Sequence, residues 1–245
     1  MPSLTVHHLQ VGQGERVPWL LEELNIPYEL KLHQRNPLFS PPDLKALHPM
    51  GASPVLEDAT GNTEKPLILG ESGAIVEYII NKYGDGRLAL KPDHPNYADY
   101  LYWFHFSNSN FQGVIGRVMT VYGVTQDSSN LRVKTVEDRL HVALAHFNKR
   151  VAENTWLAGD EFTAADVMSV FSFTTMRKFQ NFDLSQYQGI LDWLKRCTDR
   201  PAYRTAMKKG DPELDIEELI SPKGPAKFEG FAKMVALLQQ KKKKL

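Results

Sequence analysis

The sequence predicts an α/β domain followed by an all-helical domain. Short β-prone segments alternate with helical periodicity up to residue 83, whereas no strand pattern appears after residue 96. Residues 84–95 are rich in glycine and proline and carry no periodic run, which is typical of an interdomain linker. We therefore expect domains at 1–83 and 96–220, followed by a charged C-terminal extension at 221–245.

The first domain should have the element order β-α-β-α-β-β-α. The expected elements are strands over 4–9, 28–33, 55–57 and 67–69 and helices over 15–24, 43–47 and 71–83. Pro18 agrees with this order because it falls in the first turn of a helix, where proline is tolerated. A βαβ unit followed by a ββα unit is the thioredoxin-like layout. The single cysteine, Cys197, leaves no C-x-x-C motif, so the sequence excludes disulfide exchange by a dithiol.

The second domain should be a helical bundle rich in aromatic residues. Apolar spacing predicts helices over 97–122, 133–151, 190–197 and 202–207, and another that begins near Thr163 and runs through Met176. Thr163 and Asp166 have the spacing of a capping box, so we expect Asp166 to be structural and not catalytic. Cys197, close to a helix end, is expected to be a small buried apolar residue.

Composition indicates a soluble intracellular protein. The 245 residues are 42% hydrophobic, and 29 basic residues balance 29 acidic ones, so nothing favours nucleic acid as a partner. We see no signal peptide and no apolar run of the ~18–20 residues that span a bilayer, and we expect a cytoplasmic location. The four lysines before Leu245 should form a solvated end, and the final K-K-L lacks the small first residue of a peroxisomal address.

Two motifs with a chemical rationale lie between residues 51 and 84. Ser53-Pro54 precedes an apolar strand, and proline donates no N–H to a ladder, so the backbone of Ser53 is free to hold an extended peptide. Glu71-Ser72 opens a helix, where free N–H groups and the helix dipole favour a carboxylate. Glu71 would hold an ammonium group in the same ligand. Taken singly, the two motifs would be a turn and a helix cap.

Together, the two motifs resemble the glutathione site of the glutathione transferases, and this likeness extends over roughly residues 4–205. The resemblance, to the fungal and bacterial type, implies that the Ser53-Pro54 loop pairs with the cysteinyl backbone of glutathione. It implies that Glu71 and Ser72 hold the γ-glutamyl end. It further implies a homodimer that uses glutathione as a substrate, without a metal. The expected activity joins the glutathione thiolate to hydrophobic electrophiles, with peroxide reduction as a further activity. The alternatives are a ligand-storage protein and a scaffold that keeps the fold.

The sequence departs from this family where the thiol should be activated. Serine-type members place a hydroxyl four or five residues before the arginine of the first helix, which here is Arg16, and those positions are Gly12 and Val11. Lowering a thiol pKa by two requires roughly 2.7 kcal/mol, which one or two hydrogen bonds to the anion can supply. The candidate donors are the backbone of Gly12, Gln13 and Gly14, the Gln10 or Gln13 amide, and Asn108 or Asn110. As an alternative to both kinds of donor, backbone and side-chain amide, the protein would bind glutathione and apolar ligands with little turnover.

Two further parts of the site follow from the resemblance. The glycine end of glutathione needs a donor, which Ala52 cannot supply, and the candidates are Ser40, Lys45, Arg35 and His48. A hydrophobic co-substrate would lie between the domains, and the candidates are Phe111, Met119 and Tyr122 with Asn108 and Asn110 as polar anchors. Aromatic residues at helical spacing are also typical of a core. His7 and His8 are expected to be structural, and we expect no metal site.

Overall fold

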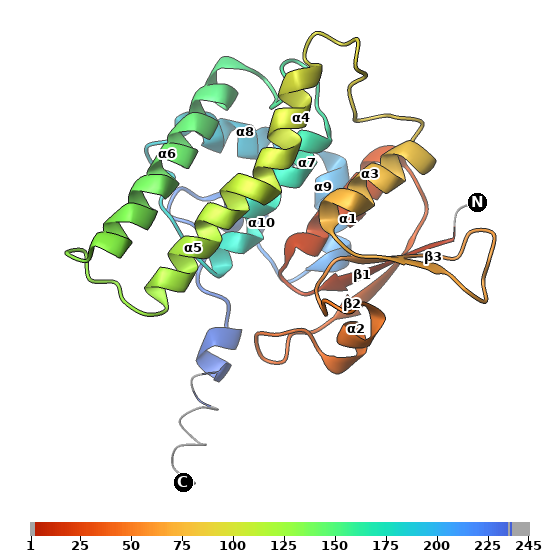
Figure 1. Cartoon of the computed structure of the whole chain (residues 1–245), viewed down its shortest axis with the longest axis horizontal. Coiled ribbons are helices and arrows are strands. Elements are labelled where there is room, and N and C mark those ends of the chain that lie inside the picture. Colours follow the sequence, from red (N-terminus) through yellow and green to blue (C-terminus); the bar gives the residue numbers. More distant parts are fainter. Residues whose placement is uncertain (1–2, 235, 237–245) are drawn as a thin grey trace.

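The computed structural model describes residues 3–234 and 236 and confirms the fold class, a thioredoxin-like domain followed by a helical domain (Figure 1). The first domain contains the predicted element order: β1 (Leu4–Leu9), α1 (Arg16–Leu24), β2 (Glu29–His33), α2 (Pro42–Leu47), β3 (Val55–Asp58), β4 (Leu67–Leu69) and α3 (Ser72–Lys82). Its four strands form one mixed sheet in the order β2-β1-β3-β4. Strand β1 is parallel to β2 and antiparallel to β3, as a βαβ unit joined to a hairpin requires.

Apolar side chains of the sheet are buried on both of its faces. Val6 and Leu56 pack in one core with α1 and α3. Leu9 and Val55 belong to a second, smaller core together with Leu44 of α2. The sheet therefore fixes α2 on the face opposite to α1 and α3, and it brings the C-terminal end of β1 close to the loop before β3.

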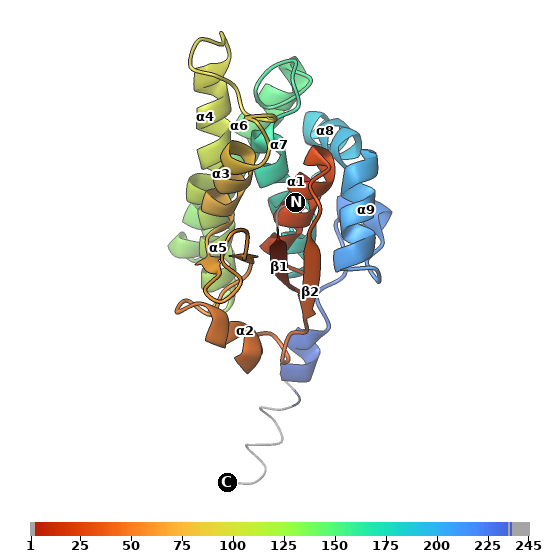
Figure 2. The same ribbon diagram turned by 90° about the vertical axis from the view of Figure 1, so that its right-hand side faces the viewer.

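The second domain is helical from Tyr97 onward. Its α-helices are α4 (Tyr97–Phe106), α5 (Gln112–Tyr122), α6 (Leu131–Glu153), α7 (Ala164–Val170), α8 (Gln188–Thr198), α9 (Pro201–Gly210) and α10 (Ile216–Ile220). Figure 2 shows β1, β2 and α1 between the α3–α5 side of the molecule and α9. Helix α9 packs on α1 and β2, so the two domains share an extended apolar contact.

Two helix predictions for this domain need correction. The single helix predicted over 97–122 is interrupted by a π-helical turn at Ser107–Phe111. The helix predicted through Met176 ends at Val170, and two 3₁₀ turns follow, Phe171–Phe173 and Thr175–Lys178. Between these turns Thr174 has φ −115° and ψ −105°, which no helix contains. The interruption lets the hydroxyls of Thr174 and Thr175 reach Glu15 in the first domain.

The C-terminal segment, defined here as residues 221–234, folds back onto both domains. The backbone N–H of Phe228 donates to the Lys178 carbonyl at 2.9 Å, and its side chain is buried. A Cβ atom at Gly230 would lie 2.3 Å from the carbonyl oxygen of Pro37, so this part of the segment presses against the loop after β2. The lysine run and the final K-K-L lie outside the described residues.

Residues 3–234 and 236 contain no helix that is both long and apolar enough to cross a bilayer.

The predicted capping box at the start of α7 is confirmed. Thr163 Oγ1 accepts a hydrogen bond from the Ala165 N–H at 3.3 Å, and Asp166 Oδ2 accepts one from the Thr163 N–H at 3.1 Å. Asp166 Oδ1 also accepts bonds from the Leu157 N–H at 3.1 Å and Trp193 Nε1 at 2.9 Å. The carboxyl group is completely buried, and burial raises its pKa to about 6.

We predict that Asp166→Ala lowers the free energy of unfolding by about 3 kcal/mol or more, because each of three buried donors left without an acceptor costs about 1–3 kcal/mol. Urea unfolding followed by tryptophan fluorescence measures this loss. The control is Asp160→Ala, an exposed position, which should change stability by less than about 0.5 kcal/mol. A loss below about 1 kcal/mol for Asp166→Ala would contradict the structural role.

Candidate functional site

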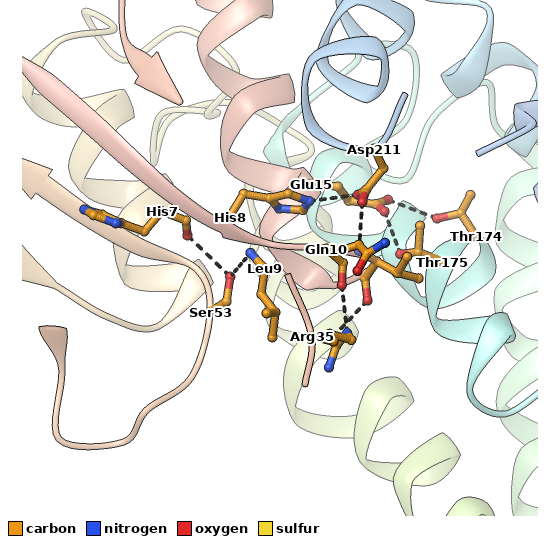
Figure 3. Close-up of polar contacts among 11 residues, drawn as sticks. His7, His8, Leu9, Gln10, Glu15, Arg35, Ser53, Thr174, Thr175 and Asp211 are labelled. Carbon is orange, nitrogen blue, oxygen red and sulfur yellow. Dashed lines mark hydrogen bonds and ion pairs between the residues drawn. The ribbon is translucent and has the colours of Figure 1, made fainter. Parts of the chain in front are cut away.

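Two loops meet beside the end of β1. The peptide bond between Ser53 and Pro54 is cis. Ser53 Oγ accepts a hydrogen bond from the Leu9 N–H at 3.0 Å and donates one to the His7 carbonyl at 3.4 Å (Figure 3). A Cβ atom at Gly14 would lie 3.0 Å from Ser53 Oγ and 2.5 Å from His8 Nδ1. Only glycine at residue 14 therefore lets the loop of residues 10–14 lie this close to Ser53.

The N-terminus of α3 forms a third wall of the site. Glu71 is exposed and has φ +66°, a left-handed conformation that is rare outside glycine and that often marks functional positions. Its carbonyl oxygen accepts the Ile75 N–H at 2.9 Å and so begins the helix. Ser72 is buried at the first helical position, where the backbone N–H groups lack helical partners. This wall therefore offers a carboxylate together with a helix N-terminus.

Gln13 connects the Ser53 loop to the rest of the site. Its Nε2 donates to the Ser53 carbonyl at 3.0 Å. Its Oε1 accepts hydrogen bonds from Arg16 Nη1 at 3.3 Å and from Gln112 Nε2 at 3.2 Å. The resemblance implies that the Ser53 carbonyl pairs with the backbone of the ligand. The Gln13 amide therefore already occupies one hydrogen-bonding position of that carbonyl oxygen.

Arg16 joins three parts of the chain at this site. Its Nη1 donates to Ser72 Oγ at 3.0 Å and to Asn108 Oδ1 at 2.7 Å, and its Nη2 donates to Gln112 Oε1 at 3.3 Å. Asn108 Nδ2 in turn donates to Ser72 Oγ at 3.3 Å. The guanidinium carbon lies 5.0 Å from the centre of the Phe171 ring. Asn108 on the π-helical turn thereby links the second domain to α3.

The charge of Arg16 has neutral hydrogen-bond partners within the described residues. The side chain is completely buried, its Nε has no acceptor there, and its other bonds go to amide and hydroxyl oxygens. Burial lowers the pKa of the guanidinium, while the adjacent Glu15 raises it. Burying a charge without a hydrogen-bonded counterion is unfavourable. The site behind Ser72 therefore favours a bound anion.

The sequence did not identify Arg16 or Gln112 as site residues. Arg16 served only as the reference point for the missing hydroxyl, although an arginine on the apolar face of a short helix signals a buried charge. Gln10 contributes its backbone here, because its N–H donates to the His33 carbonyl at 2.9 Å. Gly12 lies between Val11 and the 3₁₀ turn of Gln13–Glu15.

Candidates for the glycine end of glutathione lie around α2. Ser40 is half-buried just before the helix, and the exposed Lys45 contacts Gly51, where a Cβ atom would lie 3.0 Å from Lys45 Cγ. The His48 ring lies beside Gly70, next to Glu71.

Arg35 does not remain a candidate for the glycine end, because its guanidinium donates to three backbone carbonyls, those of Gln10, Val11 and Leu38.

The residues predicted for the hydrophobic co-substrate do not form one pocket. Phe111 is a core residue, 1% exposed and stacked on Phe173 with ring centres 4.6 Å apart. Asn110 lines a separate groove of about 680 Å³ between the α4–α5 segment and α6. Tyr122 donates a hydrogen bond to Glu137 of α6, and Met119 is exposed. Asn108 and Asn110 are two positions apart on the same helical turn and therefore face different sides, Asn108 toward the cleft beside Gly73 and Asn110 toward the groove beside α6.

A cleft of about 740 Å³ runs between α3 and α4 and reaches Gly73 and Asn108, next to Ser72. Leu69, Phe104 and Met168 supply part of its apolar lining, while Glu77 and Lys82 supply charge. The cleft thus offers mixed surface beside the proposed γ-glutamyl position. Within residues 3–234 and 236, no cluster of three or more histidine, cysteine or acidic residues could hold a metal ion.

Comparison with known proteins identifies the family. Residues 13–82 match the family model described as glutathione S-transferase, N-terminal domain, and residues 114–201 match glutathione S-transferase, C-terminal domain. Glutathione S-transferase 3 of Schizosaccharomyces pombe is 30% identical over 242 residues, which cover 91% of this chain and 96% of that relative. This chain belongs to the glutathione S-transferase family.

Solved structures agree with the family assignment. A glutathione S-transferase from Actinobacillus pleuropneumoniae has a TM-score of 0.75 and 28% identity, covering 87% of this chain and 95% of that one. The glutathione transferase URE2P8 from Phanerochaete chrysosporium, solved with oxidized glutathione, has a TM-score of 0.68 and 22% identity, covering 85% and 95% respectively. The latter likeness concerns the fold alone. The thioredoxin-like domain and the helical domain expected from the sequence are therefore those of a glutathione S-transferase.

Glu15 forms a second buried contact between the domains of this glutathione S-transferase. Its carboxyl group accepts hydrogen bonds from Thr174 Oγ1 at 3.0 Å and Thr175 Oγ1 at 2.6 Å (Figure 3). Burial raises its pKa from 4.5 to about 7, and the two hydroxyl groups limit the rise. The folded protein therefore binds more protons than the unfolded chain between these values, so this group makes stability fall as pH rises from about 4.5 to about 7.

We predict that Glu15→Gln removes this fall, because the amide stays neutral. Relative to the wild type, the variant should gain about 2 kcal/mol or more in free energy of unfolding between about pH 5 and about pH 8. Urea unfolding at several pH values measures the difference. Glu64→Gln, at an exposed loop position, should show a constant difference across the same range. A constant difference for Glu15→Gln would contradict the raised pKa.

Proposed function

We propose that this protein binds glutathione between the Ser53-Pro54 loop and the N-terminus of α3, and transfers its thiolate to apolar electrophiles. Membership of the glutathione S-transferase family supports the reaction class. One structural observation carries the assignment of the site: the buried Arg16 cation lies behind Ser72 with neutral hydrogen-bond partners. A pocket with that charge, and with Glu71 at its rim, is suited to a zwitterionic ligand.

The γ-glutamyl end of glutathione matches the wall formed by α3. Glu71 would take the ammonium group, while Ser72 and the first N–H groups of α3 would take the carboxylate. The Ser53 backbone would pair with the cysteinyl residue next to Pro54. Its carbonyl oxygen has two lone pairs, so it can accept from the ligand N–H while it still accepts from Gln13 Nε2.

The thiolate requires donors at the loop of residues 10–14. The backbone N–H groups of Gly12, Gln13 and Gly14 precede α1, whose N-terminus adds the positive end of its dipole. One or two hydrogen bonds to the sulfur, each worth about 1.5–3 kcal/mol, would lower the thiol pKa by about 1–2 or more. The amides of Gln13, Gln10 and Asn108 are additional donors. No side-chain hydroxyl is needed for this mechanism.

The remaining features of the proposal concern the periphery of the site. Lys45 and Ser40 would meet the glycine carboxylate from the α2 side. The co-substrate would bind between the domains, in the cleft of α3 and α4 that Leu69, Phe104 and Met168 line. Met119 is an exposed apolar side chain on α5 and does not line that cleft. Exposed apolar residues on α4 and α6, such as Leu101, Tyr102 and Val142, support a homodimer.

Two assays on the purified protein test the function. Retention on glutathione-agarose with turnover of chlorodinitrobenzene supports the enzyme. Retention without turnover instead indicates a storage protein that uses the same cleft. Absence of both indicates a scaffold that has kept the fold.

We predict that Glu71→Ala reduces retention on glutathione-agarose by tenfold or more, because a charge-assisted hydrogen bond to the ammonium group is worth about 1.5–3 kcal/mol. Isothermal titration with glutathione gives the affinity directly. Glu64→Ala removes another exposed carboxylate, from the loop between β3 and β4, and should bind like the wild type. Unchanged affinity in Glu71→Ala would rule out this site.

A further inference from the structure

The peptide plane between Gln10 and Val11 is held from both sides. The Gln10 carbonyl accepts a hydrogen bond from Arg35 Nε at 2.7 Å (Figure 3). The Val11 N–H donates to Asp211 Oδ1 at 2.9 Å. The C=O and N–H of a trans peptide point in opposite directions, so Arg35 and Asp211 form hydrogen bonds with opposite sides of the same peptide group. Arg35 follows β2 in the first domain, whereas Asp211 ends α9 in the second.

The next peptide plane is held by the same arginine. The Val11 carbonyl accepts a hydrogen bond from Arg35 Nη2 at 2.9 Å. Planarity then directs the Gly12 N–H away from Arg35, and that N–H has no acceptor within the described residues. A Cβ atom at Gly12 would lie 3.1 Å from Arg35 Nη2, so a side chain at this position would face Arg35. The Gly12 N–H is thus available as a hydrogen-bond donor at a position where this chain lacks a side-chain hydroxyl.

Val11 adopts a strained conformation between these two planes. Its φ is +50°, a left-handed value that is an outlier for a β-branched residue. Such a conformation is unfavourable and persists when the surrounding structure fixes it. The hydrogen bonds that Arg35 donates to both carbonyls, and the one that the Val11 N–H donates to Asp211, supply that fixation.

The side chains of Arg35 and Asp211 are themselves held by contacts with neighbouring residues. Asp211 Oδ2 is 2.8 Å from His8 Nε2, and both side chains are buried. The Arg35 guanidinium lies 4.8 Å from the centre of the Phe179 ring and 6.0 Å from that of Phe228. Phe228 belongs to the C-terminal segment, which therefore covers the arginine.

We propose that Arg35 and Asp211 are positioning residues that aim the Gly12 N–H at the glutathione sulfur, and that the C-terminal segment assists by covering Arg35. This proposal rests on the proposed function. Neither residue needs to touch the substrate, because each acts through the backbone of Gln10 and Val11. A long-range effect of charge makes a different prediction, since loss of the Asp211 carboxylate alone would favour the nearby thiolate.

The test is the thiol pKa of bound glutathione, measured by ultraviolet thiolate absorbance against pH. Arg35→Lys keeps the charge but loses the fork that spans two carbonyls. We expect it to raise the thiol pKa by about 1, which means a tenfold smaller thiolate population below that pKa. Below the wild-type value of this pKa, where glutathione binds as the thiol, the dissociation constant should change less than kcat. Arg87→Lys is the matched control, because Arg87 also donates to backbone carbonyls but lies far from this loop along the chain.

Two further variants keep the test decisive. Asp211→Ala should raise the thiol pKa, and a lowered value would overturn positioning in favour of simple charge. Phe228→Leu keeps an apolar side chain in the C-terminal segment but removes the aromatic ring beside Arg35. It replaces Arg35→Lys as the test if that variant fails to fold. We expect Phe228→Leu to raise the thiol pKa by less than the change of about 1 expected for Arg35→Lys. An unchanged value in Phe228→Leu would then overturn the proposal.

The two proposals fail in different ways. A lowered thiol pKa in the wild type that Arg35→Lys leaves unchanged overturns the positioning role alone. A wild-type protein that does not bind glutathione, or that binds it with an unshifted thiol pKa, overturns the proposed function and the positioning role with it.

Discussion

The buried Arg16 guanidinium is the interaction on which the rest of the site depends. It joins α1 to the N-terminus of α3 through Ser72, and to the second domain through Asn108 and Gln112. Its hydrogen-bond partners are neutral, and the adjacent Glu15, whose own pKa is raised by burial, balances its charge only in part, so the guanidinium favours an anion in the cleft. The same contacts fix the distance between the two loops and α3, so binding geometry and electrostatics have one physical origin.

The helical domain is consequently part of the site as well as a cover for the sheet. Asn108, Asp211 and the two threonines after Phe173 all contact the segment of residues 11–16. The chain lacks a hydroxyl at residues 11 and 12, yet it holds the backbone there in a conformation that valine does not favour. In the proposed mechanism this rigid backbone replaces the hydroxyl, since a preorganised N–H does not have to reorient when charge develops on sulfur.

Local patterns predicted the elements and the two motifs of the proposed site, whereas partners distant in sequence could not be predicted. Alternation and helical spacing gave the sheet and most helices, and Glu71-Ser72 was found because a helix cap is a local signal. His8 and Asp211 lie 203 positions apart, and no spacing rule connects them. The π-helical turn and the break at Thr174 also escaped prediction, because tertiary hydrogen bonds override helical periodicity there.

A crystal structure of the glutathione complex tests the central claim most directly. The account predicts that the sulfur lies within about 3.5 Å of the Gly12 backbone nitrogen, with the γ-glutamyl carboxylate at Ser72 and the Val11 conformation unchanged. A sulfur held instead by a side-chain hydroxyl, or glutathione bound away from Ser53 and Ser72, would contradict it.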